Sequence, residues 1–378
     1  MLEFGSSKIK LITHMFDGKY DVAIIGGGVI GAISALFLRQ HGLNIVVLER
    51  NSILANEASR AGGGIISPLH PWRYSEAMLD LASWSHEFYP DFVKQISAYS
   101  GVNVPLTKTG MIVPDTIEAE DALNCKFLNS RIVLPDEIFE IEPSLASRQE
   151  SVFVEGVCNV RNPALCKALP VTLKKASVHM MTNVNINQVH FLDSMYEIDT
   201  NYRKLFAEKI VVCAGAWSSE VFDLFGNSID QQNMPSIYPV KGQMLAFKAK
   251  SGLLRTVILE QNRYLIPRHD GIVIVGSTVE NVGFEKQTTN AAKLELLDFA
   301  HKMLPSLRRY PVISHWSGLR PGCDRDKPYI CQVKNHVNLF LNIGHFRNGL
   351  LSAPASAQVL ADIMLGLDTT FDLNQYAI

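Results

Sequence analysis

The stretch Tyr20-Asp21-Val22-Ala23-Ile24-Ile25-Gly26-Gly27-Gly28-Val29-Ile30-Gly31-Ala32 decides the fold of this chain. Its apolar run from Val22 to Ile25 is too short for a helix and suits a strand that is buried on both faces. Ile30, Ile33 and Phe37 then recur at the spacing of a helix. The sequence therefore predicts a parallel strand, a glycine turn and a helix in immediate succession.

The glycines of this turn, Gly26, Gly28 and Gly31, form the pattern G-x-G-x-x-G. The first allows a tight turn, the second lets a pyrophosphate approach the backbone, and the third lets the helix pack on the strand. The phosphates would then lie at the helix N-terminus, where unpaired N–H groups favour anions. A second predicted strand, 44–48, ends at Glu49, whose carboxylate can accept hydrogen bonds from a ribose and would repel the extra phosphate of NADP. The alternative is a glycine turn that only shapes a loop, but the flanking strands and the acid favour a dinucleotide site.

Length and charge restrict the remaining possibilities. The 378 residues suggest two or three domains. A net charge of −2, with both signs interspersed, gives no reason to expect a nucleic-acid partner. No apolar run approaches the roughly 18 residues that span a membrane. Residues 1–19 lack the apolar centre and cleavage site of a secretory signal, so we expect an N-terminal extension outside the fold.

The 6 cysteines show no C-x-x-C pair and no paired spacing typical of a metal site. The chain is also far longer than the small domains that disulfides hold together. We therefore expect reduced thiols in a cytoplasmic protein, and no metal centre.

Two further stretches extend the predicted nucleotide site. Residues 58–68 contain Ser59 and Arg60, which can reach a phosphate, followed by a triple glycine that can lie against a flat ligand. The alternative for this stretch is a flexible loop. Residues 209–217 read as a buried strand ending on small residues, which is suited to passing close beneath a nucleotide.

The rest of the chain predicts a second, mixed domain. Residues 101–160 lack the regular alternation of strands and helices, and from Tyr238 the pattern is rich in strands. Asp270-Gly271 lies between two apolar runs and predicts a hairpin within an antiparallel sheet. Helices are expected over 162–175 and 291–304.

Two late stretches each place one arginine among glycines and apolar residues: Arg320 in 316–322 and Arg347 in 344–354. Such an arginine is either an ion-pair partner within the fold or a bidentate ligand for a substrate carboxylate. Gly349 precedes another helix-like run, and in a flavin site the positive end of that helix would stabilise the anionic reduced ring.

Taken in order, these motifs resemble the D-amino-acid oxidase family of FAD enzymes and, within it, the glycine oxidases of thiamine biosynthesis. The resemblance runs from about Tyr20 to Leu365, and its most specific part is His345-Phe346-Arg347-Asn348-Gly349. It implies an α/β fold, α+β overall, with a Rossmann-type FAD-binding domain and a discontinuous second domain on a mixed or antiparallel β-sheet. The implied divisions are an extension at 1–19, an FAD-binding domain at 20–85, 160–230 and 315–378, and a substrate-binding domain at 86–159 and 231–314.

The resemblance also implies the residues of the site. Arg320 corresponds to the arginine that binds the substrate carboxylate, Tyr264 to the tyrosine that shares it, and Arg347 to the family arginine near the pocket. Ile65 and Val279 occupy pocket positions where relatives often carry methionine. The residues expected to bind FAD are Gly26, Gly28, Val29, Ile30, Gly31, Glu49, Arg50, Ser59, Arg60, Gly63, Gly64, Ile65, Val184, Ala214, Gly215, Trp217, Arg320, Gly344, His345, Phe346, Arg347, Asn348, Gly349 and Leu350.

The reaction implied is the oxidation of glycine or another small amino acid or secondary amine, such as sarcosine or a small D-amino acid. FAD would accept the hydride and O2 would be reduced to H2O2, while the imine is hydrolysed or passed to thiazole synthesis. Cys323 lies several residues out of register with the cysteine that holds flavin covalently in related sarcosine oxidases, so we expect non-covalent FAD. We expect Trp72 and Trp84 to be exposed and compatible with the interface of a homo-oligomer, either a tetramer or a dimer.

Two other functions stay open at this point. The first is a D-amino-acid dehydrogenase of the same fold that passes electrons to a quinone or another carrier. The second is an FAD-bearing binding protein, or the oxidase module of an RNA-modifying enzyme. The nearly neutral charge and the lack of a fused methyltransferase domain disfavour the RNA version.

Overall fold

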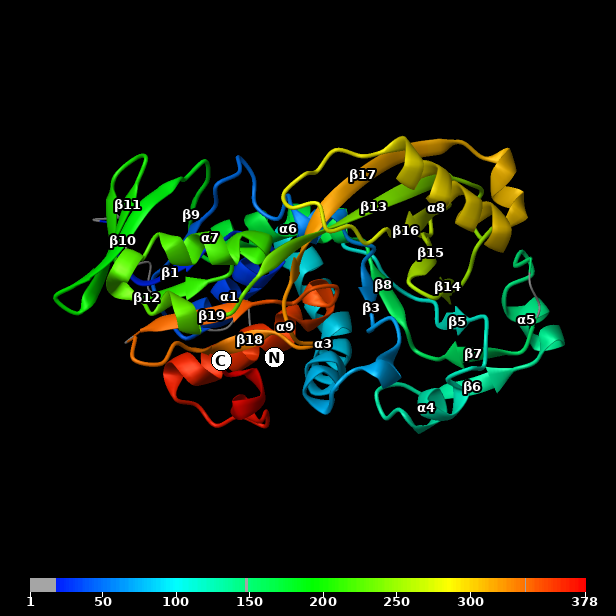
Figure 1. Cartoon of the computed structure of the whole chain (residues 1–378), viewed down its shortest axis with the longest axis horizontal. Helices are drawn as coiled ribbons and strands as arrows, with labels where there is room; N and C mark the ends of the chain where they lie inside the picture. Colours follow the sequence, from blue (N-terminus) through cyan, green and yellow to red (C-terminus); the bar gives the residue numbers. More distant parts are fainter. Residues whose placement is uncertain (1–17, 147–148, 337) are drawn as a thin grey trace.

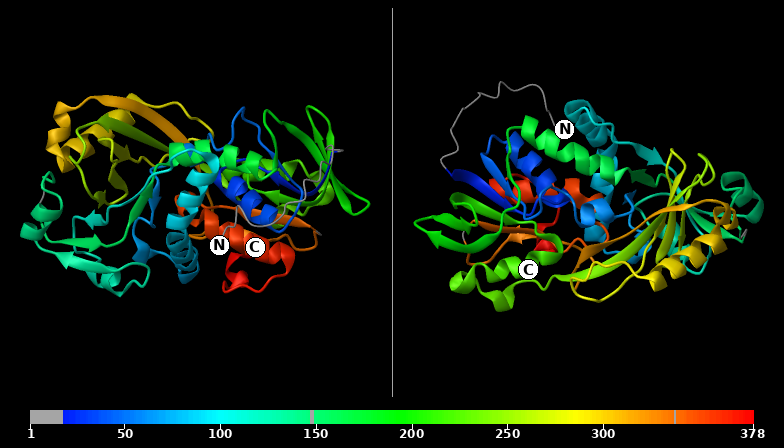
Figure 2. Two further views of the ribbon diagram at one scale, coloured as in Figure 1. Left: turned by 180° about the vertical axis from the view of Figure 1, so that it is seen from behind. Right: turned by 90° about the horizontal axis from the view of Figure 1, so that it is seen from above.

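The computed structural model describes residues 18–146, 149–336 and 338–378. In this part of the chain two large sheets form the two ends of an elongated molecule, as Figures 1 and 2 show. The long strands β13 (Tyr238–Lys248) and β17 (Val312–Gly322) reach from the second sheet towards the first (Figure 1). Residues 1–17 of the predicted extension lie outside the described residues, and the first strand begins at Lys19, one residue before the expected start.

The first sheet is built around β1, which pairs in parallel with β2 on one side and β12 on the other. Its order is β10-β11-β12-β1-β2-β9, with β19 also paired to β12 and β18 to β19. The predicted succession of strand, glycine turn and helix is confirmed, because β1 leads through Gly26 to Gly28 into α1 (Val29–Gln40). The strands are β1 (Lys19–Ile25), β2 (Ile45–Leu48), β9 (His179–Met181), β10 (Ile186–Leu192), β11 (Met195–Thr200), β12 (Lys204–Val212), β18 (Tyr329–Gln332) and β19 (Leu339–Ile343).

Both faces of this sheet are covered, which explains the continuous apolar run in β1. On one face, Ile24 and Val47 pack against α1, α3, α6 and α9. On the other face, Ala23 and Ile25 pack in a core with α7 and the β10–β11 hairpin. Continuous burial of this kind is what a parallel sheet between two layers requires. The helices of this half are α1, α2 (Ala58–Ala61), α3 (Glu76–Ser100), α6 (Asn162–Lys175), α7 (Ser218–Asp223) and α9 (Gly349–Leu365).

The second sheet has the order β17-β13-β16-β15-β14-β5-β7-β6, and all its pairs are antiparallel except β14 with β5. The predicted hairpin is confirmed as β15 and β16, and the predicted helix 291–304 as α8. Alternation along β15 sends Leu265 into the core beneath α8 and Tyr264 to the opposite face. The remaining elements are β5 (Met111–Val113), β6 (Ser130–Val133), β7 (Ser151–Val154), β14 (Val257–Glu260), β15 (Arg263–Pro267), β16 (Ile272–Gly276), α4 (Ala119–Asn124), α5 (Pro135–Ile141) and α8 (Asn290–Met303).

A small third sheet joins the two halves in the order β3-β8-β4. It brings the end of the 58–68 loop next to the segment that leads into α6. Its strands are β3 (Ile65–Ile66), β4 (Leu106–Lys108) and β8 (Cys158–Val160), and short 3-10 turns include Pro71–Arg73, Gly215–Trp217, Gly226–Ser228, Gln231–Asn233, Pro305–Arg309 and Leu373–Tyr376.

Three of the expected boundaries between the two domains fall inside single elements, and the one at 159/160 cuts β8. The boundary at 85/86 cuts α3, whose buried side chains on both sides of that point belong to the core of the first sheet. The boundary at 314/315 cuts β17, which pairs with β13 along its length. Because one helix packs on one core and one strand belongs to one sheet, residues 76–100 go with the first half and 312–322 with the second.

The expected exposure of Trp72 and Trp84 is wrong, because both side chains are half-buried. The Trp84 ring stacks on Phe88, with 4.9 Å between centroids. The Trp72 indole N–H donates a hydrogen bond to Glu118 Oε2 at 2.5 Å. These two residues therefore no longer support a subunit interface. In the ranges that the structure describes, no helix combines the length and the apolar character needed to cross a membrane.

Candidate active site

The glycine turn packs tightly on β12 and leaves one side open. Gly26 has a φ of +109°, and a Cβ at this position would lie 2.4 Å from the carbonyl oxygen of Cys213. A Cβ on Gly31 would lie 2.0 Å from the carbonyl oxygen of Gly26, so α1 rests directly on the turn. A Cβ on Gly28 would meet only the hydroxyl of Ser59, at 3.5 Å. The open side of the turn therefore lies at Gly28, at the N-terminus of α1.

Side chains complete this end of the site. The Ser59 hydroxyl accepts a hydrogen bond from the Val29 N–H at 2.9 Å, which places it beside the first turn of α1. Glu49 is buried, and its carboxylate accepts hydrogen bonds from the N–H groups of Gly27 (2.9 Å) and Asn51 (2.8 Å). Because an ionised carboxylate has about four acceptor positions, Glu49 keeps capacity for a ribose hydroxyl.

A single cavity runs from this turn to the two predicted arginines. It passes between the first sheet and the inner face of the second. The predicted residues that line it are Gly26, Gly28, Val29, Ile30, Glu49, Arg50, Ser59, Gly63, Gly64, Ile65, Val184, Ala214, Gly215, Trp217, Tyr264, Arg320, Gly344, His345, Phe346, Arg347, Asn348, Gly349 and Leu350.

Three predicted residues do not line the cavity. Gly31 lies beneath the turn, as its contact with Gly26 shows. Arg60 is exposed, whereas its neighbour Ser59 lines the cavity. Val279 is 49% exposed, because Thr278 and Glu280 on either side hydrogen-bond to β13 and an extended backbone alternates its side chains. The structure therefore does not place Val279 in a substrate pocket.

At the end of the cavity nearest Trp217, aromatic and charged side chains stack on one another. The Arg50 guanidinium lies 3.7 Å from the centre of the Trp217 ring, and Phe284 stacks on the same ring with 5.5 Å between centroids. Arg50 also pairs with Glu57 at 3.9 Å. These contacts hold the Trp217 ring in place beside the cavity.

The end of the cavity at the second sheet contains Arg320 on β17 and Tyr264 on β15. Arg320 is half-buried and donates hydrogen bonds to the Ser277 hydroxyl (2.6 Å) and the Thr278 carbonyl (3.3 Å). Its guanidinium lies against Gly242 of the neighbouring strand, where a Cβ would come within 2.2 Å of the guanidinium nitrogen. Diagonal neighbours on paired strands share a face, so Gly242 is what allows this close approach.

Arg320 and Arg347 give this end a net positive charge. Burial lowers the pKa of Arg320 below its usual value; the neighbouring Tyr264 side chain opposes this change and the charge of Arg347 adds to it. A guanidinium nevertheless stays protonated in proteins. Among the described residues, no carboxylate forms an ion pair with either arginine. Two unpaired cations beside one cavity favour an anionic ligand.

A buried polar layer lies beneath the segment 344–349. His345 is fully covered, its Nε2 lies 2.9 Å from Asn342 Oδ1, and its Nδ1 lies 3.0 Å from the Ser352 hydroxyl. Burial lowers the pKa of His345 to about 3, so the ring is neutral at physiological pH. Gly349 and Leu350, at the start of α9, line the cavity above this layer. The second predicted helix N-terminus therefore does face the site.

Sequence reasoning missed several lining residues, among them Met244, Ser277 and Asn342. The sequence did contain an indication for Asn342, because it is the one polar residue in the apolar run of β19. The sequence gave no indication that Ser277 and Met244 line the cavity, because their position depends on how β13 and β16 pair.

Comparison with known proteins gives one consistent result. Residues 21–363 match the family model described as FAD dependent oxidoreductase (DAO). The chain is 37% identical over 363 residues to the glycine oxidase of Pseudomonas aeruginosa, covering 94% of this chain and 98% of that protein. It is 36% identical over 367 residues to the glycine oxidase of Pseudomonas putida, covering 94% and 97%. The crystal structure of glycine oxidase from Geobacillus kaustophilus superposes with a TM-score of 0.88 at 25% identity, covering 95% of this chain and 98% of that one.

Proposed function

This chain belongs to the DAO family of FAD dependent oxidoreductases, and on that premise we propose that it oxidises glycine or another small amino acid or secondary amine. Sarcosine and small D-amino acids are the other candidates. The overall reaction for glycine is glycine + O2 + H2O → glyoxylate + NH3 + H2O2, unless the imine passes to thiazole synthesis before it is hydrolysed. The observation that carries the proposal is the pair of unpaired arginines at one end of a cavity whose other end has the features of a dinucleotide site.

The residues of the cavity fit FAD. The open side of Gly28 and the start of α1 would hold the pyrophosphate, since N–H groups at a helix N-terminus favour anions. Glu49 would bind the ribose, and the start of α9 would lie near the isoalloxazine. When bound, FAD supplies the acceptor for the hydride that leaves the substrate.

The protein side chains at the other end would bind and orient the substrate. Arg320 would hold the carboxylate through its planar guanidinium, and the Tyr264 hydroxyl would share that carboxylate. Met244 and Ile65 would line an apolar space that excludes water. The amine must be neutral to give up a hydride from Cα, and orientation of that bond is the main contribution of these residues.

Non-covalent attachment of FAD is part of the proposal. Cys323 does not line the cavity, and its sulfur lies 3.1 Å from the carbonyl oxygens of Arg325 and Gly344, either of which can accept its single S–H. Burial raises the pKa of this thiol, which disfavours the reactive thiolate. All 6 cysteines are free, which fits the expected cytoplasmic location.

Anaerobic mixing with amines tests the proposal. Glycine, sarcosine and D-alanine are added in turn to the FAD-loaded protein, and bleaching of the oxidised flavin spectrum is followed. We expect at least one of them to bleach the flavin, and H2O2 to form when air is admitted. Bleaching followed by electron transfer to a quinone or dye, without H2O2, would instead indicate a dehydrogenase. A flavin that none of the three reduces would overturn the proposal.

A further inference from the structure

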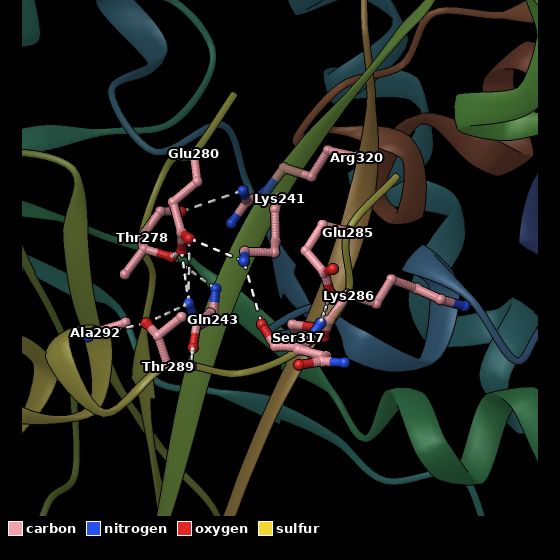
Figure 3. Close-up of polar contacts among 11 residues, drawn as sticks. Lys241, Gln243, Thr278, Glu280, Glu285, Lys286, Thr289, Ala292, Ser317 and Arg320 are labelled. Atoms are coloured by element: carbon pink, nitrogen blue, oxygen red, sulfur yellow. Dashed lines mark hydrogen bonds and ion pairs between the residues drawn. The ribbon is translucent and has the colours of Figure 1, made fainter. Parts of the chain in front are cut away.

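A polar cluster that is buried at Lys241, Gln243 and Thr278 and exposed at Thr289 lies behind Arg320, outside the cavity. It consists of Lys241 and Gln243 on β13, Thr278 and Glu280 in the segment after β16, and Thr289 before α8, and we call it the Glu280 cluster. Lys241 is 2% exposed and Gln243 is 0% exposed. Figure 3 shows Lys241, Gln243 and Thr278 around the Glu280 carboxylate, and Thr289 beside Gln243. None of the five lines the cavity, so the cluster does not bind the substrate directly.

The Glu280 carboxylate is the centre of this cluster. It accepts hydrogen bonds from Lys241 Nζ (3.1 Å), from Gln243 Nε2 (2.9 Å) and from the Thr278 hydroxyl. Burial raises the pKa of Glu280, but the hydrogen bonds from Thr278, Gln243 and Lys241 outweigh burial and hold the pKa below its usual value. A buried lysine without its carboxylate is costly, so Glu280 and Lys241 depend on each other.

The same residues fix the backbone of the segment 277–280 on β13. Lys241 and Glu280 exchange two backbone hydrogen bonds of 2.9 Å each. The Gln243 N–H donates to the Thr278 hydroxyl at 2.8 Å, and the Thr289 N–H donates to the Gln243 side-chain oxygen at 2.8 Å. Backbone pairing with β13 and the bond from Gln243 to Thr278 therefore hold this segment, and the Glu280 carboxylate adds the link that ties the Thr278 side chain to Lys241 and Gln243.

Ser277 and Thr278 are the residues to which the Arg320 guanidinium donates. Figure 3 shows Arg320 extending from β17 across β13 towards Thr278. On its other side the guanidinium lies against Gly242, which has no side chain to direct it. The hydrogen bonds that orient the guanidinium thus come from the segment that Glu280 holds.

We propose that Glu280, held by Lys241 and Gln243, is a positioning residue that orients the Arg320 guanidinium for a small carboxylate. The inference deepens the proposed function and rests on it for the role of Arg320. It assigns to Glu280 an effect on carboxylate affinity, although Glu280 touches neither the substrate nor the cofactor.

Titration of the flavin spectrum with propionate, a carboxylate that lacks an amine, tests this inference in the FAD-loaded protein. We expect Glu280→Gln to raise the Kd of propionate and the KM of glycine about tenfold or more, as loss of a charge-assisted hydrogen bond does. The rate of flavin reduction at saturating glycine should fall by less. Glu260→Gln is the matched control, since Glu260 pairs with the exposed Lys302 at 3.2 Å in the same sheet, and both values should stay within about twofold for such a surface pair.

A double-mutant cycle separates positioning from a general structural role. If Glu280 acts through Arg320, then adding Glu280→Gln to Arg320→Met changes the propionate Kd no further. An additive loss, or a Glu280→Gln protein that keeps its FAD and binds propionate as the wild type does, would overturn the inference. If Glu280→Gln does not fold, Thr278→Val and Thr278→Ser decide the question: valine should weaken propionate binding and serine should restore it, and equal binding in both would contradict the inference.

The outcomes for the wild type keep the two proposals apart. A wild type that binds propionate but is not reduced by glycine or its analogues contradicts the proposed oxidation only. A wild type that does both, while Glu280→Gln is indistinguishable from it, contradicts the positioning role only. A wild type that glycine reduces but that binds no propionate contradicts the positioning role only, because Arg320 would then not bind a small carboxylate.

Discussion

The two ends of the cavity are built in different ways. The cofactor end comes mainly from backbone atoms of one contiguous stretch, in which Gly26, Gly28 and Glu49 follow one another along β1, α1 and β2. The substrate end consists of side chains from separate strands, Tyr264 on β15 and Arg320 on β17. We infer that substitutions which add atoms have the largest effect at the cofactor end. Substitutions which remove a charge or a hydrogen bond have their effect at the substrate end.

The largest expected effect is at the cofactor end. Gly26→Ala should abolish FAD binding and lower the free energy of unfolding by about 3 kcal/mol or more, because the added Cβ would meet Cys213 and the backbone is left-handed. The measurements are flavin content after purification and urea unfolding.

The matched control is Gly42→Ala, in the same strand-helix-strand unit. Gly42 also has a positive φ, +84°, but no atom lies within 4 Å of its added Cβ. It should cost only about 1–2 kcal/mol and keep FAD. A Gly26→Ala protein with full flavin content would show that close backbone packing does not limit FAD binding at the cofactor end.

The next effect is at the substrate end. Arg320→Met should lower kcat/KM for glycine about 10²-fold to 10³-fold while FAD stays bound, because it removes the charged partner of the carboxylate. Steady-state kinetics and flavin content measure the two parts separately. Arg131→Met removes a surface arginine of the same sheet, paired with Glu155 at 3.1 Å, and should leave kcat/KM nearly unchanged. Unchanged glycine kinetics in Arg320→Met would remove the assignment.

The buried polar layer beneath the segment 344–349 predicts a pH dependence of stability. The folded pKa of His345 is lowered to about 3, so the unfolded chain takes up a proton below about pH 6.5 that the folded chain does not. Stability from this group is therefore complete above pH 6.5 and is lost as the pH falls, by at most about 1.4 kcal/mol per pH unit. Urea unfolding between pH 7.5 and 5 should show a flatter pH dependence for His345→Gln than for the wild type. Equal slopes would show that His345 titrates normally.

The smallest expected effect is that of the Tyr264 hydroxyl at the substrate end. Tyr264→Phe should raise the KM of glycine about tenfold, because it removes one hydrogen bond to the carboxylate and leaves the Arg320 charge in place. Tyr202→Phe, at a side chain 60% exposed, is the control and should change nothing. A Tyr264→Phe effect larger than that of Arg320→Met would show that the hydroxyl, rather than the guanidinium charge, dominates the binding of the carboxylate.

Much of the cofactor end could be predicted from the sequence because its signals are local. The strand at Val22 to Ile25, the turn at Gly26 and the acid at Glu49 lie within thirty or so residues, and each follows from a period or a spacing. The prediction that Val279 lines the substrate pocket is wrong because its position depends on contacts that are not local in the sequence. The family resemblance placed Val279 at the pocket, but Thr278 and Glu280 contact β13 and the Val279 side chain faces solvent.

The sequence by itself determined the family, the FAD-binding unit and the two arginines as candidates for a carboxylate. Only the tertiary structure decided that Arg320 rests against Gly242, that Glu280 orders the segment which orients it, and that Arg347 has no acidic partner in the described ranges. The physical reason is that a turn and a helix start are set by neighbouring residues, whereas these contacts depend on the register between β13, β16 and β17. That register is set by the packing of the whole sheet.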